Sequence, residues 1–222
     1  MKPTYFTIAF LGLLAIILQP VSAGTVPTIA IELRSETTAN YETNLEIPRI
    51  SHLGNRDIQN KINAVFSTDI IDFAQNLTTE AAEYAQDVAV QGWELRPYQI
   101  LTQVQTNQIT TEFISISVLY YQYTGGAHGF TEKRSYNFNL QTGKEIKLAD
   151  LFPEGTDYQD LINQKIQEQL VKREGLEFVP ITEDQPFYLK EGQLVVYYGL
   201  YEIGPYVAGI PEFIITEARL KI

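Results

Sequence analysis

The residues whose types could support chemistry are the two histidines of the chain, His52 and His128. His128 lies in the sequence Gly125-Gly-Ala-His-Gly129, where the glycines would allow the backbone to approach a ligand closely. The alternative is a turn in which His128 bonds a neighbouring carbonyl. A metal ion needs three or four ligands, and without cysteine only a carboxylate-rich site with one histidine stays open. We therefore predict no metal site and no cofactor, and the candidate ligand-binding residues here are Gly125, Gly126, His128 and Gly129.

Covalent catalysis would need a serine or threonine nucleophile, a histidine base and an acid that orients the histidine. These residue types occur, but the sequence contains no nucleophile elbow, so we assign no catalytic residue and expect that the chain is not an enzyme. Paired carboxylates such as Glu145 and Asp150 are more typical of solvated strand edges or helix caps. The Gly125-Gly126 step is not a phosphate-binding loop, because no Lys-Ser or Lys-Thr opens a helix after it.

A second candidate surface lies near the C-terminus, where Tyr201 and Tyr206 flank the Gly204-Pro205 break. Rigid aromatic side chains on an ordered loop are good anchors for a protein or a sugar ligand. The alternative is a loop that tucks its tyrosine and isoleucine side chains over a sheet. We name Tyr201 and Tyr206 as candidate ligand-binding residues.

The charge balance limits the classes of partner. The chain has a formal net charge of −11 and no visible basic stripe, which argues against nucleic acid and against an anionic membrane surface. A cationic protein partner would be attracted. The alternative is that the acidity only keeps an exported domain soluble.

Residues Met1–Ala23 are typical of a secretory signal peptide. Phe6–Leu18 is an apolar run too short for a comfortable membrane span, and Val21-Ser22-Ala23 is a small-residue cleavage site. An uncleaved anchor is the alternative. We predict cleavage after Ala23, a secreted or periplasmic location, and no stable membrane span after signal removal. Cleavage would remove Lys2 and no acidic residue, which changes the net charge from −11 to −12.

Alternating apolar residues predict strands at Thr28–Ser35 and Tyr41–Ile47, which would form a hairpin that ends at Pro48. Asn55 is a good helix N-cap. Apolar residues at spacings of three and four follow it as far as Gly92, where the helix should stop. This pattern predicts one long helix with a single apolar stripe.

Two further strands are predicted at Arg96–Thr106 and Ile109–Tyr123, joined by a short Asn107-Gln108 link. The second of them has two partly apolar faces, as expected for a central strand covered on both sides. Phe130–Leu140 alternates cleanly, and its polar face is expected to see water. The remaining predicted elements are a turn at Gln141–Gly143, a second helix from Thr156 or Asp157, a hairpin at Phe187–Tyr198 and a short strand at Phe213–Thr216.

Runs of strands around two helices, without a regular alternation of strand and helix, predict an α+β fold. We expect a mainly antiparallel sheet, one long N-terminal helix and a second helix, arranged as two intimately packed subdomains. The length of 222 residues allows this. We divide the chain into a signal peptide at 1–23, an N-terminal hairpin-helix-strand subdomain at 24–123 and a C-terminal subdomain at 124–222.

Three segments carry a resemblance to a known family: Tyr123-Thr-Gly-Gly-Ala-His-Gly, Tyr136-Asn-Phe-Asn-Leu-Gln-Thr-Gly-Lys-Glu-Ile with Asp150-Leu-Phe, and Tyr201-Glu-Ile-Gly-Pro-Tyr-Val-Ala-Gly-Ile-Pro-Glu-Phe. They resemble the extracytoplasmic domain of RsiV-type anti-sigma factors. They are similar also to the accessory domain beside the catalytic domain of PdaC-type peptidoglycan deacetylases. The resemblance covers most of Thr28–Leu220.

The resemblance implies a binding role, because in RsiV-type proteins this domain binds lysozyme. It implies no sigma-factor role, since the chain shows no sigma-binding segment and no internal transmembrane helix. We expect a secreted bacterial module, of largely unknown function, that binds a basic lysozyme-like protein or a cell-wall component. The alternative is a cell-wall hydrolase or deacetylase-associated enzyme that acts on peptidoglycan.

Overall fold

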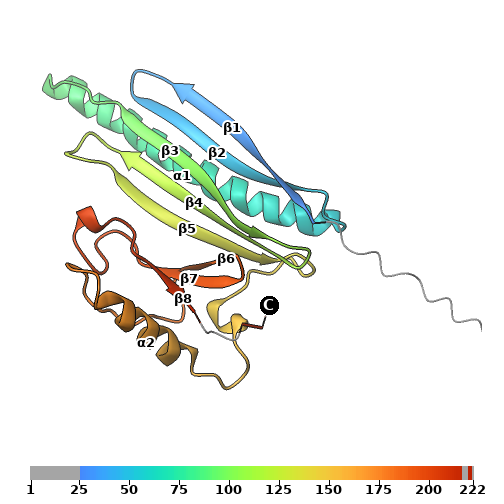
Figure 1. The fold of residues 1–222 in the computed structure, drawn as a ribbon. Coiled ribbons are helices and arrows are strands. Elements are labelled where there is room, and N and C mark those ends of the chain that lie inside the picture. The colour runs from blue at the N-terminus through green and yellow to red at the C-terminus, as the bar shows by residue number, and fades with distance from the viewer. Residues whose placement is uncertain (1–25, 217–219, 222) are drawn as a thin grey trace, which may run out of the picture.

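The computed structural model describes residues 26–216 and 220–221, so the predicted signal peptide lies outside the described residues. The described chain forms a five-stranded sheet, a three-stranded sheet and two α-helices (Figure 1). The predicted α+β class is confirmed, as are its mainly antiparallel sheet and its two helices. Along this part of the chain, neither helix combines the length and the apolar character that crossing a membrane requires.

The larger sheet has the order β1-β2-β3-β4-β5, and its strands are β1 Thr28–Thr37, β2 Tyr41–Ser51, β3 Tyr98–Ile109, β4 Phe113–Tyr123 and β5 Phe130–Asn139. The smaller sheet consists of β6 Phe187–Lys190, β7 Gln193–Tyr197 and β8 Glu212–Ile215. The helices are α1 Arg56–Gln91 and α2 Tyr158–Leu170, with short 3₁₀ helices at Leu148–Leu151 and Tyr206–Ala208. Only β2 and β3 pair in parallel among the described strands, because α1 carries the chain across between them.

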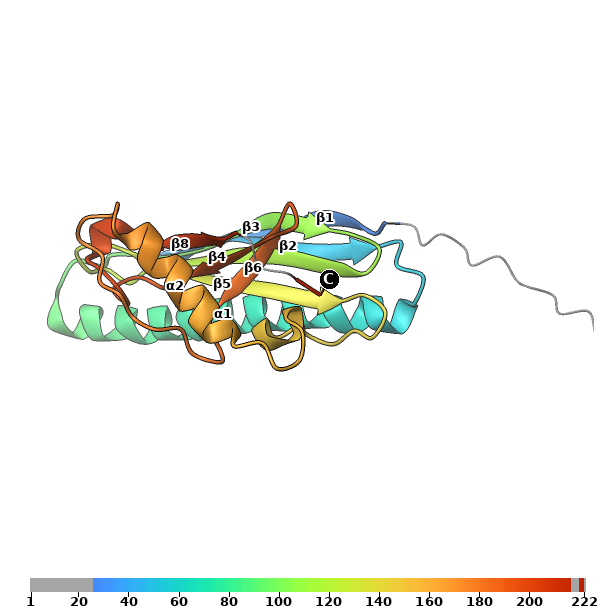
Figure 2. The same cartoon turned by 60° about the horizontal axis from the view of Figure 1, so that its bottom comes forward.

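Helix α1 runs along one face of the larger sheet (Figure 2). Both of its predicted ends are confirmed. The Asn55 side chain accepts hydrogen bonds from the backbone N–H groups of Asp57 and Ile58, and Gly92 ends the helix in a left-handed conformation with a φ of +68°. The apolar stripe is buried at Ile62, Phe66, Ile70, Ala74, Leu77, Ala81 and Val88, and all of these except Val88 belong to the core shared with the sheet.

The core between α1 and the sheet also holds a polar chain. The hydroxyls of Tyr120 and Tyr136 lie 2.6 Å apart, and the Tyr136 hydroxyl donates to the Asp69 carboxylate of α1 at 3.0 Å. Burial raises the pKa of Tyr120 to about 12 and raises the pKa of Tyr136 further, so both remain hydrogen-bond donors at neutral pH.

The smaller sheet lies across the opposite face of the larger sheet. This position makes one prediction wrong: the polar face of β5 does not see water, because β6 covers it. The Asn137 side chain donates to the Phe187 carbonyl at 2.9 Å, and the Leu189 N–H donates to the Ser115 hydroxyl at 2.9 Å. Ser115 also donates to Asn137 at 2.7 Å. Polar residues on β4 and β5 therefore satisfy the backbone edge of β6, which would otherwise be buried without partners.

Pro48 does not end the second strand as predicted, because β2 continues to Ser51. The Glu46 N–H points toward β3 and donates to the Thr102 hydroxyl at 2.9 Å. Two residues later, the ring nitrogen of Pro48 faces the same way. Pairing with β3 stops at Leu45, so the missing N–H of Pro48 leaves no partner unsatisfied.

The predicted Asn107-Gln108 link is also wrong, because β3 continues through it to Ile109. The register of the pairing between β3 and β4 shifts between Thr106 and Gln108, and this irregularity keeps Asn107 and Gln108 within the strand. The turn lies at Thr110, whose hydroxyl accepts from the N–H groups of Glu112 and Phe113. The larger sheet then continues through β5, so it extends across the subdomain boundary that we predicted after Tyr123. That boundary stays an interpretation.

Candidate functional site

The two candidate surfaces predicted from distant parts of the sequence lie together in the structure. The first is the β4–β5 loop at residues 124–129, and the second is the loop between β7 and β8. The rings of His128 and Tyr206 stack with centroids 4.4 Å apart and an interplanar angle of 29°. Tyr201 follows, with its ring centroid 5.7 Å from that of Tyr206. We call His128, Tyr201 and Tyr206 the aromatic junction.

Gly129 is the point at which the two loops are bonded. The Tyr206 hydroxyl donates to the Gly129 carbonyl at 3.1 Å. His128 Nδ1 lies 2.9 Å from the same oxygen, so the Nδ1–H tautomer donates to it and leaves Nε2 as an acceptor. His128 thus bonds a neighbouring carbonyl, as in the turn that we gave as the alternative to a ligand site. The residue is exposed rather than buried. The side chain of His128 is therefore accessible to a ligand.

The glycines of the β4–β5 loop differ in what the structure requires of them. A Cβ atom on Gly129 would lie 2.4 Å from the Tyr121 ring, so the close approach needs glycine. Gly125 adopts a φ of +85°, and its carbonyl accepts from Arg96 Nη1 at 3.2 Å. Gly126 is exposed, and a Cβ there would meet nothing within 4 Å. Gly125 and Gly129 shape the loop, whereas no structural reason requires Gly126.

An ion pair with a buried lysine holds the bases of the two loops together. Lys133 lies on β5 shortly after the first loop, and Glu212 begins β8 directly after the second. Their side chains approach to 2.5 Å, with 5% of the Lys133 side chain and 39% of the Glu212 side chain exposed. The Lys133 ammonium lies 4.2 Å from the ring centroid of Tyr188 and 5.1 Å from that of Tyr197. Two aromatic faces thus surround the cation.

Both tyrosines also act as hydrogen-bond donors in this cluster. The Tyr188 hydroxyl donates to Glu212 at 2.9 Å, and the Tyr197 hydroxyl donates to the Lys133 carbonyl at 3.1 Å. Burial raises the pKa of Tyr197 to about 12. Burial, and then the hydrogen bond to Glu212, raise the pKa of Tyr188 as well. Both hydroxyls therefore stay protonated at neutral pH and keep donating.

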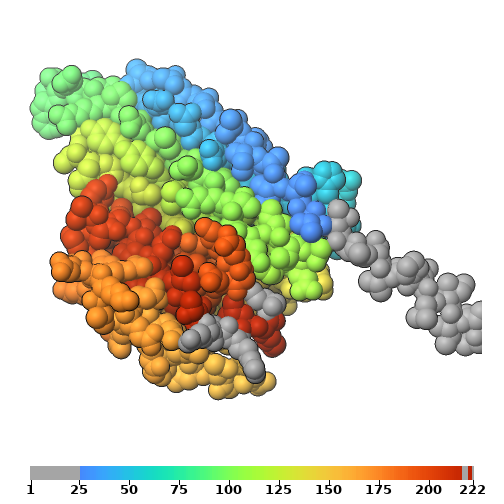
Figure 3. All heavy atoms as spheres, in the orientation of Figure 1, coloured from blue at the N-terminus to red at the C-terminus, as the bar shows by residue number. Residues whose placement is uncertain are grey.

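A trough runs from the aromatic junction across the larger sheet. A hollow of about 400 Å³ lies beside Tyr206, and another of about 530 Å³ lies over β1–β4. Leu119 and Thr131 line both hollows, so the two hollows lie side by side. Figure 3 shows the red loop near residues 200–210 against the yellow-green end of the larger sheet. Leu119 and Thr131 were not predicted from the sequence, because their exposure depends on where the smaller sheet docks on the larger one.

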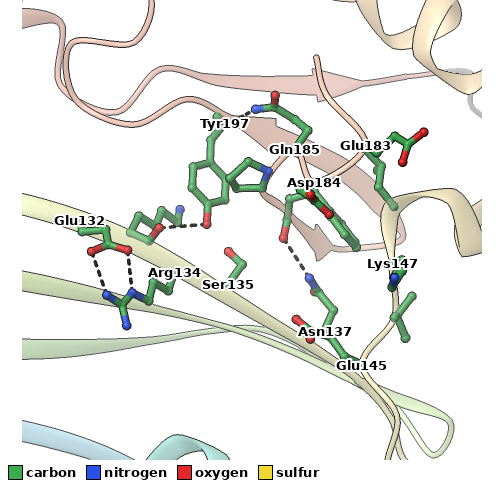
Figure 4. A pocket seen from close by; sticks show the side chains of 15 residues that line it. Glu132, Arg134, Ser135, Asn137, Glu145, Lys147, Glu183, Asp184, Gln185 and Tyr197 are labelled. Atoms are coloured by element: carbon green, nitrogen blue, oxygen red, sulfur yellow. Dashed lines mark hydrogen bonds and ion pairs between the residues drawn. The ribbon is translucent and has the colours of Figure 1, made fainter. Parts of the chain in front are cut away.

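A third pocket, of about 380 Å³, lies between β5 and the segment that leads into β6 (Figure 4). Some of its polar groups bond to one another: Gln185 donates to the Tyr197 carbonyl at 2.6 Å, and Arg134 bonds Glu132 at 2.6 Å. Glu145, Glu183 and Asp184 add carboxylates to the lining. Among the described residues, no group of three or more histidine or acidic side chains is arranged to hold a metal ion. We interpret this pocket as part of the seam between the two sheets.

The other histidine lies at the far end of the hairpin, next to two hydroxyls. His52 Nδ1 is 3.0 Å from the Thr28 hydroxyl and 3.2 Å from the Ser51 hydroxyl, and these hydroxyls are 2.8 Å apart. His52 also has a φ of +64°, which is unusual for a residue with a Cβ. A nucleophile and a base are thus adjacent. None of the hydrogen bonds between described residues joins the His52 imidazole to an acid. The arrangement is therefore not a triad.

Comparison with known families gives two consecutive matches. Residues 34–131 match the family described as Deacetylase PdaC, and residues 149–217 match the Protein of unknown function family DUF3298. The chain joins these two family regions. The predicted resemblance to PdaC-type deacetylases is therefore confirmed, while the resemblance to RsiV-type proteins stays a prediction. The junction loop at residues 124–129 lies inside the first region, and the loop with Tyr201 and Tyr206 lies inside the second.

Two curated proteins resemble parts of the chain. Peptidoglycan-N-acetylmuramic acid deacetylase PdaC of Bacillus subtilis is 25% identical over 111 residues, which are 46% of this chain and 24% of that protein. Esterase Rv3036c of Mycobacterium tuberculosis is 30% identical over 131 residues, which are 54% of this chain and 58% of that protein. The chain thus spans about a quarter of the deacetylase and somewhat more than half of the esterase.

Solved structures share the fold. A DUF3298 family member from Bacteroides fragilis matches with a TM-score of 0.65 at 18% identity, over 85% of this chain and 90% of that one. A DUF3298 family protein from Pseudomonas aeruginosa matches with a TM-score of 0.60 at 15% identity, over 86% of this chain and 91% of that one. The combination of both sheets is therefore the shared architecture.

Gly129→Ala tests the geometry of the aromatic junction. The new Cβ would collide with the Tyr121 ring, so we expect the loop to shift and the bond from Tyr206 to be lost. The His128 ring protons, which lie over the Tyr206 ring, should move downfield in the proton NMR spectrum. With only two histidines in the chain, their assignment is simple.

Gly126→Ala is the matched control, because its Cβ meets open space. It should leave the His128 resonances unchanged. Unchanged His128 resonances in Gly129→Ala would show that the close approach to Tyr121 does not hold the junction together.

Proposed function

We propose that this chain is an extracytoplasmic binding module whose contact surface is the aromatic junction and the adjoining trough. The observation that carries the proposal is the meeting of two loops from different family regions, which presents stacked aromatic rings on the surface. Tyr201 is 55% exposed and Tyr206 is 38% exposed, although both rings are held by neighbours. Aromatic side chains that are exposed yet ordered lose little conformational entropy when they bind a partner.

Two considerations support the proposed extracytoplasmic location. The sequence predicts a signal peptide at Met1–Ala23. One relative is named as a peptidoglycan deacetylase, and peptidoglycan lies outside the cytoplasmic membrane. The module would therefore meet its ligand in the cell envelope or beyond it.

The partner that we propose is a basic, lysozyme-like protein. The formal charge of −11 would speed its encounter with a cationic partner. Such steering is screened over a Debye length of about 8 Å at physiological ionic strength, so charge alone gives only weak association. Specific binding would need anchors, and Tyr206 with Tyr201 and His128 would supply them.

Titration with an animal-type lysozyme at low and at physiological salt tests this proposal. We expect binding to weaken with salt but to persist, because the aromatic contacts are not screened. Tyr206→Ala should weaken binding about 30-fold or more, as expected when an anchor worth about 2 kcal/mol is removed. Isothermal titration calorimetry measures both effects.

Trp93→Ala is the control variant, since it removes an aromatic side chain that is 69% exposed beyond the end of α1. It should bind like the wild type. Binding that vanishes at physiological salt, or that Tyr206→Ala leaves intact, would mean that the charge serves solubility and that lysozyme is not the partner.

A cell-wall hydrolase is the second candidate, favoured by the names of the two relatives and by the contact of Ser51 with His52. Without an orienting acid, we expect hydrolysis of a short chromogenic ester no faster than with a Ser51→Ala variant. A wild-type rate well above the buffer rate that Ser51→Ala abolishes would favour the hydrolase instead.

A further inference from the structure

The outer strand β1 has a long backbone edge that faces away from the rest of its sheet. It pairs with β2 from Thr28 to Thr37 in one continuous register, and no described strand lies on its other side. It lacks an internal proline or a bulge, two common devices that block pairing at an edge. Leu33 is 72% exposed and Ile31 is 41% exposed. Figure 3 shows β1 in blue along the outer rim of the molecule.

Bonds to β2 identify which backbone groups of β1 face outward. The Glu36 N–H donates to the Thr43 hydroxyl at 3.1 Å, and the Glu36 carbonyl accepts from the same hydroxyl at 3.5 Å. Both backbone groups of Glu36 therefore point at β2. Because these groups alternate between the two edges of a strand, those of Ile31, Leu33 and Ser35 face away from β2.

We propose that β1 pairs with β1 of a second copy of this chain, antiparallel, with Leu33 opposite Leu33 across a two-fold axis. Ile31 of each copy would then lie opposite Ser35 of the other, so that outward backbone groups meet outward backbone groups. The two larger sheets become one continuous sheet, and the β1 edge of neither copy remains open. This inference goes beyond the proposed function, because it concerns the backbone edge of β1, at the edge of the sheet opposite β5, and not the aromatic junction.

The charges of β1 disfavour the two neighbouring registers, with the axis at Arg34 or at Glu32. With Leu33 on the axis, Glu32 of each copy lies opposite Arg34 of the other. An axis at Arg34 would oppose two Arg34 side chains and would also place Glu32 opposite Glu36. An axis at Glu32 would oppose two carboxylates. Opposite charges directly across an antiparallel pair stabilise it, and like charges destabilise it.

The ion pairs within one copy are compatible with this arrangement. Glu32 bonds Arg34 at 2.6 Å and Arg49 at 2.7 Å. Arg34 of the second copy would extend this network rather than replace it. All these side chains lie on one face of the sheet, while Leu33 lies on the other and lines the end of the trough.

The position of α1 leaves room for the second copy. The helix packs on β2 and β3 rather than on β1. Neighbouring strands are about 4.8 Å apart, so the two β2 strands of the dimer would be about 14 Å apart. This separation exceeds the diameter of a helix with its side chains, about 10–12 Å, so the two α1 helices do not collide.

Because the chain has no cysteine, a single Leu33→Cys substitution tests the register. Cα atoms of a hydrogen-bonded antiparallel pair are about 5.5 Å apart, within the range of roughly 4.4–6.8 Å that a disulfide spans. Mild oxidation should therefore link the copies rapidly. Val171→Cys, at a position that is 86% exposed in another part of the molecule, should link far more slowly.

Sedimentation of the purified protein at micromolar concentration tests the dimer itself. We expect twice the mass of one chain, and Arg34→Glu should weaken the dimer at least about tenfold, because two favourable pairs become repulsive. Arg56→Glu makes the same change of charge at the start of α1 and should leave the dimer intact. Circular dichroism confirms that each variant is folded.

Three results would overturn the proposal: a wild-type monomer at every concentration, a dimer that Arg34→Glu does not weaken, or cross-linking of Leu33→Cys no faster than that of Val171→Cys. The affinity of Arg34→Glu for lysozyme should equal that of the wild type, except for the electrostatic effect of the changed net charge. Failure of the dimer is thus distinguishable from failure of the proposed function.

Discussion

The ion pair between Lys133 and Glu212 is the interaction on which the arrangement of the candidate site depends. It joins β5 of the larger sheet to β8 of the smaller sheet, and each residue lies next to one of the two site loops. The Lys133 ammonium is almost wholly buried, so it needs a partner to offset its lost hydration. Glu212 and the faces of Tyr188 and Tyr197 supply that partner. If the smaller sheet moved away, the cation would be left unpaired in an apolar cluster.

Polar side chains extend this constraint along the whole seam between the sheets. Ser115 and Asn137 bond the backbone of β6, and Gln108 accepts from the Gly192 N–H at 2.9 Å. Hydrophobic packing alone would tolerate small sliding motions, whereas a buried hydrogen bond has one good geometry. The seam therefore fixes where the smaller sheet sits on the larger one. That position decides that Tyr206 reaches His128 and that the trough beside them stays open.

The sequence predicts those parts of the fold that depend on local pattern. Asn55 and Gly92 mark the ends of α1, because capping and a left-handed C-terminal residue are local requirements. The polar face of β5 misled the prediction, because Asn137 bonds a strand that lies 50 residues further along the chain. Alternation reports that a face is polar, but it does not distinguish water from the edge of another strand as the polar partner.

The candidate site shows the same limit. Glycine, histidine and tyrosine in irregular segments indicated two loops of interest, and both loops form the junction. Their meeting depends on Lys133 and Glu212, which are 79 residues apart, and no sequence pattern indicated that these two side chains would pair. The close approach of Gly129 to the Tyr121 ring, which requires glycine at this position, is likewise visible only in three dimensions. Patterns of residue type therefore indicated the two loops, and the contacts between the two sheets bring the loops together.

Hydrogen exchange in a Lys133→Met variant tests this account most directly. We expect the backbone amides of residues 124–129 and of residues 201–209 to exchange faster together, while amides in the middle of α1 keep the protection of the wild type. Lys190→Met, which changes an exposed lysine on β6, should leave both loops unchanged. Unchanged exchange in both loops of Lys133→Met, or a change in one loop alone, would contradict the claim that the ion pair assembles the site.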